Sequence, residues 1–171
     1  MAAESALYST NSVEYRDMLS QKARYALHAL FVLAGRTIGE PVMIAEIAAK
    51  ARVPRKFLEQ ILVDLKRRGI LTSMRGKHGG YTLGRPADKI SFAEVIRAID
   101  GPLALAPCAS VTAYRRCGDC EDEETCAIRK VLLAARDATA SVLESRMIGD
   151  AVPQSAPTTK RPRVRAGAVA G

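Results

Sequence analysis

Residues 52–83 read RVPRKFLEQILVDLKRRGILTSMRGKHGGYTL, and this stretch decides the fold. Apolar residues recur at helical spacing through its first half, and the pattern stops at Gly69. A strand over 70–74, a glycine-rich basic tip over 75–80 and a return strand over 81–83 are predicted next. The stretch therefore predicts a helix followed by a β-hairpin.

The residues on either side extend this pattern. Helical periodicity runs from Leu19 to Gly35, and a short alanine-rich helix starts near Ile44 and ends near Val53. Two helices joined by a three- or four-residue turn are typical of a helix-turn-helix. With the basic hairpin and a further helix over 92–99, residues 18–101 are predicted to form a winged helix-turn-helix, a DNA-binding domain.

The remainder of the chain divides into four segments. Residues 1–17 are predicted to be a flexible leader and 102–127 a loop that contains the cysteines. A long helix is predicted over 123–148, with apolar positions at coiled-coil spacing that suit dimerisation (Ile128, Leu132, Ala135, Thr139 and Val142). Residues 149–171 are predicted to be a disordered basic tail. The expected fold class is mainly α with a small β-hairpin wing and a long C-terminal dimerisation helix.

Composition excludes several classes of protein. The 171 residues are 48% apolar, which suits about one globular domain. The longest apolar run, 26–34, is far shorter than the roughly 20 residues that span a bilayer. The N-terminus lacks the basic and apolar regions of a secretory signal. We therefore expect a cytoplasmic protein that does not enter a membrane.

The charge distribution indicates a polyanionic partner. The net charge is +8, and residues 18–101 alone carry a net +8, whereas 102–150 carry −2. A basic globular segment of this kind favours nucleic acid. We expect double-stranded DNA to be that partner.

Individual residues can be assigned to this contact. The apolar stripe of the 55–68 helix leaves Glu59 and Gln60 facing outward, where they can read cytosine and adenine edges. The cations of this segment suit phosphates, and Arg75 at the wing suits a narrow minor groove. The candidate DNA-binding residues are Arg55, Lys56, Phe57, Glu59, Gln60, Arg67, Arg75, Lys77 and His78. The alternative for Glu59 is an ion pair with Arg55 along the helix, and His78 can be an exposed turn residue.

These stretches resemble a known family. Residues 19–27, 57–62, 65–69, 75–84 and 90–100, followed by the cysteine loop, are similar to the IscR, NsrR and RirA type regulators, the Rrf-two family. The resemblance covers about three quarters of the chain. It implies a homodimeric transcription factor, often a repressor, with an iron–sulfur cluster near the start of the dimerisation helix. It also implies recognition positions at Lys56, Phe57, Glu59 and Gln60, with Arg75 at the wing.

Four cysteines lie within 19 residues, at Cys108, Cys117, Cys120 and Cys126. Thiolates select iron–sulfur clusters, Zn²⁺ or Cu(I). The resemblance implies that Cys108, Cys120 and Cys126 hold a 2Fe-2S or 4Fe-4S cluster. Cys117 is additional, and either it is the fourth ligand or that place is taken by a weak or external ligand. This departs from the family, because Arg129 and Arg24 occupy the positions where the family's fourth ligand is found.

Other roles for the thiols stay open. They could form a zinc site, act as a Cys117/Cys120 thiol switch, or be incidental buried thiols. An oxidoreductase built on the Cys-x₂-Cys pair is disfavoured, because no strand precedes the pair. We expect a DNA-binding repressor, not an enzyme, that binds a pseudo-palindromic operator as a homodimer. The expected signal is iron, redox state or nitric oxide.

Overall fold

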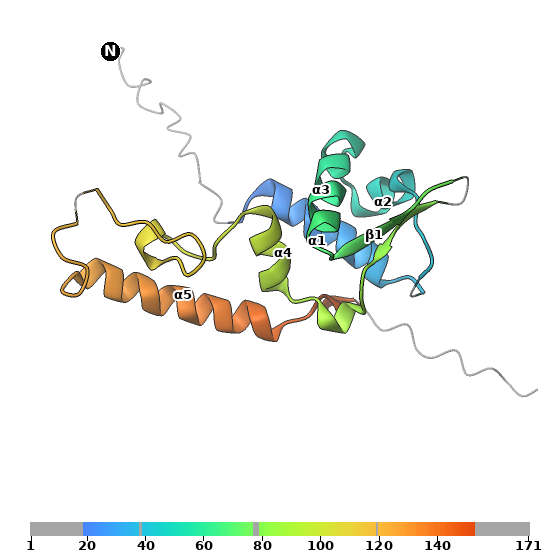
Figure 1. Cartoon of the computed structure of the whole chain (residues 1–171). Helices are drawn as coiled ribbons and strands as arrows, with labels where there is room; N and C mark the ends of the chain where they lie inside the picture. Colours follow the sequence, from blue (N-terminus) through green and yellow to red (C-terminus); the bar gives the residue numbers. More distant parts are fainter. Residues whose placement is uncertain (1–18, 38, 77–78, 119, 153–171) are drawn as a thin grey trace, which may run out of the picture.

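A computed structural model describes residues 19–37, 39–76, 79–118 and 120–152. These residues form a mostly helical structure with one antiparallel hairpin (Figure 1). The elements in chain order are α1 (Gln21–Ala34), α2 (Ile44–Ala51), α3 (Arg55–Arg67), β1 (Leu71–Met74), β2 (Gly80–Leu83), η1 (Ala87–Lys89), α4 (Phe92–Ile99), η2 (Pro107–Ala109), α5 (Ala127–Ser145) and η3 (Ile148–Ala151). The predicted fold class, helices with a hairpin wing, is confirmed.

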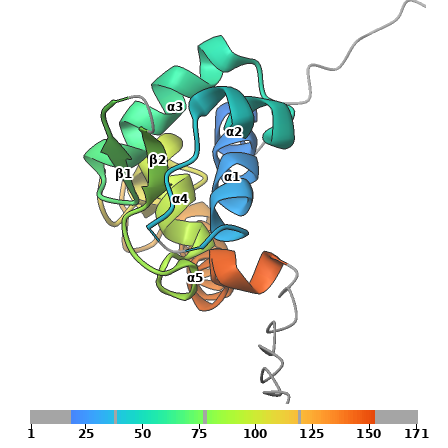
Figure 2. The ribbon, with the colours of Figure 1, turned by 90° about the vertical axis from the view of Figure 1, so that its right-hand side faces the viewer.

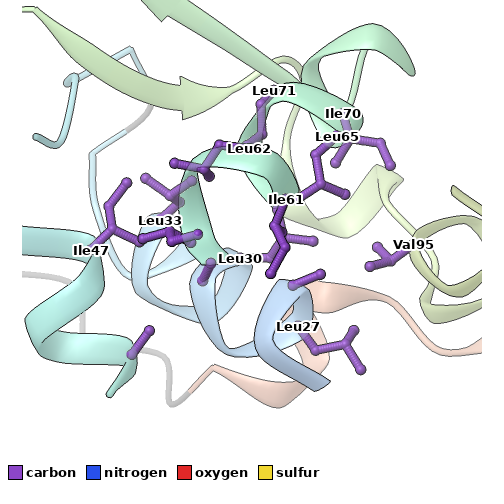
Figure 3. Close-up of a cluster of buried hydrophobic side chains, with 14 of the residues drawn as sticks. Leu27, Leu30, Leu33, Ile47, Ile61, Leu62, Leu65, Ile70, Leu71 and Val95 are labelled. Atoms are coloured by element: carbon purple, nitrogen blue, oxygen red, sulfur yellow. The ribbon is translucent and has the colours of Figure 1, made fainter. Parts of the chain in front are cut away.

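The hydrophobic core lies where α1, α2 and α3 meet (Figure 3). On α3 the buried positions are Leu58, Ile61, Leu62 and Leu65, which form a single stripe along the helix. They pack against Leu30 of α1 and its neighbours. Burying each such side chain contributes about 1.5–3 kcal/mol. The stripe therefore fixes which face of α3 is left outside.

A three-residue turn joins α2 to α3. Arg52 caps α2 in the left-handed region, with φ 54° and ψ 43°. Pro54 is the N-cap of α3. Figure 2 shows that this corner and α3 lie on the side of the molecule opposite α5.

The wing pairs Leu71 with Leu83 and Met74 with Gly80. Val42, from the connection between α1 and α2, extends the hairpin by exchanging two backbone hydrogen bonds of 2.9 Å with Tyr81. A Cβ atom at Gly80 would lie 2.4 Å from the Val42 carbonyl oxygen. Glycine is therefore required where the two backbones meet.

Helix α5 begins at Ala127, later than the predicted start at residue 123. The Asp122 carboxylate accepts hydrogen bonds from the Glu124 N–H (3.0 Å) and the Thr125 hydroxyl (2.8 Å), which form a separate turn. Cys126 is then the N-cap, because its Sγ accepts from the Arg129 N–H at 3.4 Å. The four consecutive acidic residues 121–124 thus precede the helix, and no acidic residue lies in its first turn.

The prediction of a disordered tail from residue 149 was wrong for 149–152. After α5 the chain turns back, and the Ile148 N–H donates to the Ile90 carbonyl at 2.8 Å. Ile148 is fully buried against the core, and η3 packs beside α1 and η1. A single apolar residue gives no periodicity, so the sequence pattern could not reveal this contact.

The predicted leader, 1–17, and the rest of the predicted tail, 153–171, lie outside the described residues. None of the helices in the described ranges combines the length and the apolar character needed to cross a bilayer.

Candidate functional site

The outer face of α3 carries the predicted DNA-reading residues. Arg55, Lys56, Phe57, Glu59 and Gln60 are all exposed. Glu59 accepts a hydrogen bond from Arg55 Nε at 3.3 Å, so the alternative interpretation of Glu59 describes its partner in this structure. Both side chains are more than half exposed, and such a pair is weak. Glu59 therefore remains accessible to a ligand in solution.

Phe57 lies in the first turn of α3, on this outer face. Its side chain is 62% exposed, although phenylalanine is normally buried. It is flanked by Lys56 and lies near Arg55 at the start of the helix. An exposed apolar ring beside cations suits a surface that meets both phosphates and thymine methyl groups.

Asp64 joins this face to α1. Its carboxylate accepts hydrogen bonds from Lys22 Nζ at 2.7 Å and Gln60 Nε2 at 3.0 Å, and Arg67 Nη1 lies 3.6 Å away. The Lys22 hydrogen bond is the largest cause that lowers the pKa of Asp64 below its usual value. Gln60 is thus held along the helix. The Arg67 guanidinium is 73% exposed and can reach a phosphate.

Of the predicted DNA-binding residues in the wing, Arg75 lies in the described part of the chain. Arg75 is exposed and follows β1, and Gly76 has φ 109°. Lys66 of α3 donates to Ser73 of β1 at 2.6 Å, which holds the wing against α3. Lys77 and His78 lie outside the described residues, so their predicted contacts stay predictions.

The cysteine loop is held by arginines of α5. Cys108 is buried in η2, and its carbonyl accepts from Arg129 Nε at 3.2 Å. The neighbouring Ala109 carbonyl accepts from Arg136 Nη1 at 2.7 Å. The sequence patterns did not reveal these two roles, because the contacts join residues 21 and 27 positions apart. The arginines attach the loop to the side of the helix.

The later part of the cysteine loop, from Tyr114 to Glu123, is held by local hydrogen bonds. The Cys120 N–H donates to the Cys117 carbonyl at 3.4 Å, and Arg116 Nη2 donates to the Cys120 carbonyl at 2.9 Å. The Tyr114 hydroxyl donates to Glu123, and this hydrogen bond raises the pKa of Tyr114. The Cys-x₂-Cys pair therefore sits in a tight turn.

The predicted ligands do not converge in this structure. Across the described residues, no group of three or more His, Cys, Asp or Glu side chains is arranged to hold a metal ion. Cys108 is buried within η2, whereas Cys117, Cys120 and Cys126 are partly exposed. The donor atoms have the right chemistry for a cluster, but in this arrangement the site does not fit one.

Comparison with known proteins identifies the family. Residues 19–154 match the Rrf2 family model, described as an iron-dependent transcriptional regulator. The chain belongs to the Rrf2 family. The predicted resemblance is thereby confirmed.

Individual relatives agree with this assignment. An rrf2-like HTH-type transcriptional regulator of Rhodobacter capsulatus is 40% identical over 146 residues, 84% of this chain and 97% of the relative. The structure of CymR, the global cysteine regulator of B. subtilis, has a TM-score of 0.62 at 30% identity and covers 77% of this chain and 92% of that one. The structure of T. potens IscR has a TM-score of 0.60 at 26% identity, covering 77% and 82%. This Rrf2 family member is a DNA-binding transcriptional regulator and not an enzyme.

Proposed function

We propose that this Rrf2 family member binds a pseudo-palindromic operator as a homodimer and represses transcription in response to chemistry at its cysteine loop. The observation that carries the DNA contact is the outer face of α3, where the exposed Phe57 ring stands among cations. In a helix-turn-helix the first residues of the second helix enter the major groove. A cytoplasmic location follows from the proposal, because the operator lies there.

We assign the recognition of base sequence to Phe57 and Glu59. Arg67 and Arg75 are assigned to contacts with the DNA backbone. The Glu59 carboxylate can leave Arg55 and accept from a cytosine amino group, since an exposed pair of this kind is worth only about 0.3–0.5 kcal/mol. The Phe57 ring can contact a thymine methyl group. The two wings then reach the flanking backbone.

The homodimer is assigned to α5. None of its 19 residues is buried, and Ile128, Val131 and Val142 are 72%, 68% and 61% exposed. A helix with uncovered large apolar side chains is expected to meet a partner, and the predicted 4-3-4-3 spacing suits a second copy of the same helix. This arrangement would place two α3 helices about one turn of DNA apart.

For the sensing step, the geometry favours a thiol switch at Cys117 and Cys120. The hydrogen bond that closes their turn implies Cα atoms within about 7 Å, which is compatible with a disulfide. Oxidation by a peroxide would join the two sulfurs. The thiols would give up two electrons and two protons, and the peroxide would leave as two waters. The new bond would close the turn in which the Cys120 carbonyl accepts from Arg116 Nη2.

The second candidate is an iron–sulfur cluster, 2Fe-2S or 4Fe-4S, on Cys108, Cys120 and Cys126, with Cys117 as the additional thiol. The family's description as iron-dependent and the five-residue spacing of the last two cysteines favour it. Cluster binding would require the loop to leave the arrangement described above. A zinc site on the same thiols is the remaining alternative.

Two measurements test the proposal. Sedimentation at micromolar concentration should give a dimer, and the wild-type chain should retain promoter DNA in a salt-sensitive manner. A monomer with no DNA retention would contradict the DNA-binding assignment.

The metal and sulfide content of the purified protein distinguishes the thiol switch, the iron–sulfur cluster and the zinc site. Protein purified without oxygen is assayed for visible absorption, iron, acid-labile sulfide and zinc, then treated with hydrogen peroxide and mapped by mass spectrometry. The thiol switch predicts colourless protein and a Cys117–Cys120 disulfide that lowers operator affinity, with Cys117→Ser resistant to peroxide. Brown protein with iron and sulfide, lost in Cys108→Ser, would establish the cluster instead.

A further inference from the structure

A small basic pocket lies outside α3 and the wing. It has a volume of about 330 Å³, and its lining residues are Gln21, Arg24, Tyr25 and His28 of α1 with Ala51 and Arg52 at the end of α2. Two arginines and a histidine face this pocket, and no carboxylate lines it. The chemistry of the lining suits an anion.

The backbone of Arg52 makes this pocket unusual. Arg52 is the one non-glycine residue with positive φ in the described part of the chain. Glycine adopts the left-handed cap at little cost, whereas a Cβ atom disfavours it. The cap itself uses only the backbone N–H, which bonds to the last carbonyls of α2. The turn would therefore be better served by glycine, so the arginine side chain needs another explanation.

Nothing else in the described residues employs that side chain. The exposed Arg52 guanidinium makes no hydrogen bond or ion pair with any of them. By contrast, Arg24 donates to Gln21 Oε1 at 2.5 Å and is thereby oriented along α1. One arginine of the pocket is thus held in place, and the other extends into solvent.

The pocket stands beside the end of α3 that approaches DNA. Arg52 lies three residues before Arg55, the first residue of α3. In Figures 1 and 2 the α2–α3 corner lies on the side of the molecule away from α5. A helix in the major groove is flanked on both sides by phosphates, so a cation just before its first turn meets the backbone and not a base.

We propose that this pocket is a phosphate-anchoring site, in which Arg52, with Arg24 and His28, binds a backbone phosphate beside the groove that α3 enters. The inference rests on the proposed DNA binding. It adds to the complex a contact that is independent of base sequence and that comes from α1 and the turn.

The experiment replaces Arg52 in three ways in the full-length chain. Arg52→Gly removes the charge and suits the left-handed backbone, so the protein should unfold at the same or a higher denaturant concentration than the wild type. Arg52→Lys keeps the charge. Arg146→Ala is the matched control, since Arg146 is an exposed arginine at the C-terminal end of α5 and does not line the pocket.

The probe is a fluorescein-labelled DNA duplex of arbitrary sequence, titrated at several KCl concentrations. Arg52→Gly should weaken binding on the order of tenfold at 0.1 M salt and reduce the slope of log affinity against log salt by about 0.9 per protomer. Arg52→Lys should keep most of the slope, and Arg146→Ala should match the wild type. Preference among operator sequences should be unchanged in every variant.

Other outcomes overturn the inference. If Arg52→Gly had the same salt slope as the wild type, the proposed phosphate contact would be wrong. The DNA binding of the wild type would be unaffected by that result. A shift from dimer to monomer in that variant would assign the pocket to a second copy of the chain. Competition by inorganic phosphate at constant ionic strength, lost in Arg52→Gly, would assign it to a small anion. Failure of the wild type to bind the duplex would refute the proposed function itself.

Discussion

Two acidic side chains on α3 show how a residue's partner determines its use. Among the described residues, Glu59 pairs with Arg55 on its own helix, and both side chains are exposed. Asp64 is 19% exposed and accepts from Lys22 of another helix. Exposed pairs within one helix are weak, whereas a charge-assisted hydrogen bond between elements fixes their separation. Glu59 is therefore available for DNA, and Asp64 belongs to the fold.

Replacing Glu59 and Arg67 separates base reading from backbone contact. Glu59→Ala should change which bases are tolerated, with a loss of about 1–3 kcal/mol of discrimination. Arg67→Ala should lower the affinity for all DNA sequences alike and reduce the dependence of that affinity on salt concentration. Binding to a randomised operator library measures both. A uniform loss of affinity in Glu59→Ala, with unchanged preference, would contradict its role as a reader.

Asp64→Asn should destabilise the fold in a pH-dependent way. The folded pKa of Asp64 lies below its usual 3.8, so its stabilisation is present above that pH and is lost as pH falls through the folded pKa. Denaturant unfolding should show a loss of about 1 kcal/mol near pH 7 that shrinks below pH 4. Glu40→Gln is the control, because this exposed carboxyl has no ion pair among the described residues. An equal loss at pH 3 and pH 7 would contradict this account.

At the scale of elements, the wing is positioned by a third strand-like segment. Val42 pairs with Tyr81, and the close approach of the backbones is possible because Gly80 has no side chain. Lys66 adds a contact between α3 and β1. The hairpin thus takes its orientation from both the helix-turn-helix and the α1–α2 connection.

Gly80→Ala should break this junction. The added Cβ would meet the Val42 carbonyl oxygen at 2.4 Å, and backbone atoms cannot move aside as a flexible side chain would. The expected loss is about 1–3 kcal/mol, with lower DNA affinity because the wing shifts. Gly118→Ala, where nothing lies within 4 Å, is the matched control. Equal stability of the two variants would show that the junction is not needed.

The periodicity of apolar residues predicted the helices that bury an apolar stripe. It did not predict local structure that depends on a single side-chain contact. The apolar stripe predicted the helix and most of its outer face, but the predicted stripe also included Phe57, whose side chain is 62% exposed. The start of α5 was missed because the Asp122 side chain stabilises a local turn. The family resemblance implied a ligand set, yet a resemblance does not specify whether the thiols converge. Here the Arg129 side chain donates to the Cys108 carbonyl and holds the loop in another arrangement. Long-range contacts to carbonyl groups leave no sequence pattern.

On the scale of the whole molecule, α5 is attached to the DNA-binding unit at several points. Along α5, Arg97 pairs with Glu144 at 2.5 Å. After α5, Ile148 enters the core. Helix α5 therefore contacts α4, and the η3 segment that follows it packs beside α1.

Ile148→Ala, in η3, tests this attachment, and Ile128→Ala, in α5, is its counterpart. Ile148 is fully buried within one chain, so its truncation should cost about 2–5 kcal/mol at every protein concentration. Ile128 is 72% exposed and lies on the proposed dimer face, so its loss should lower the apparent melting temperature mainly at low concentration. Thermal unfolding over a hundredfold concentration range, with sedimentation, distinguishes the two. If Ile148→Ala instead depended on concentration and Ile128→Ala did not, the return segment would belong to the dimer and α5 would not.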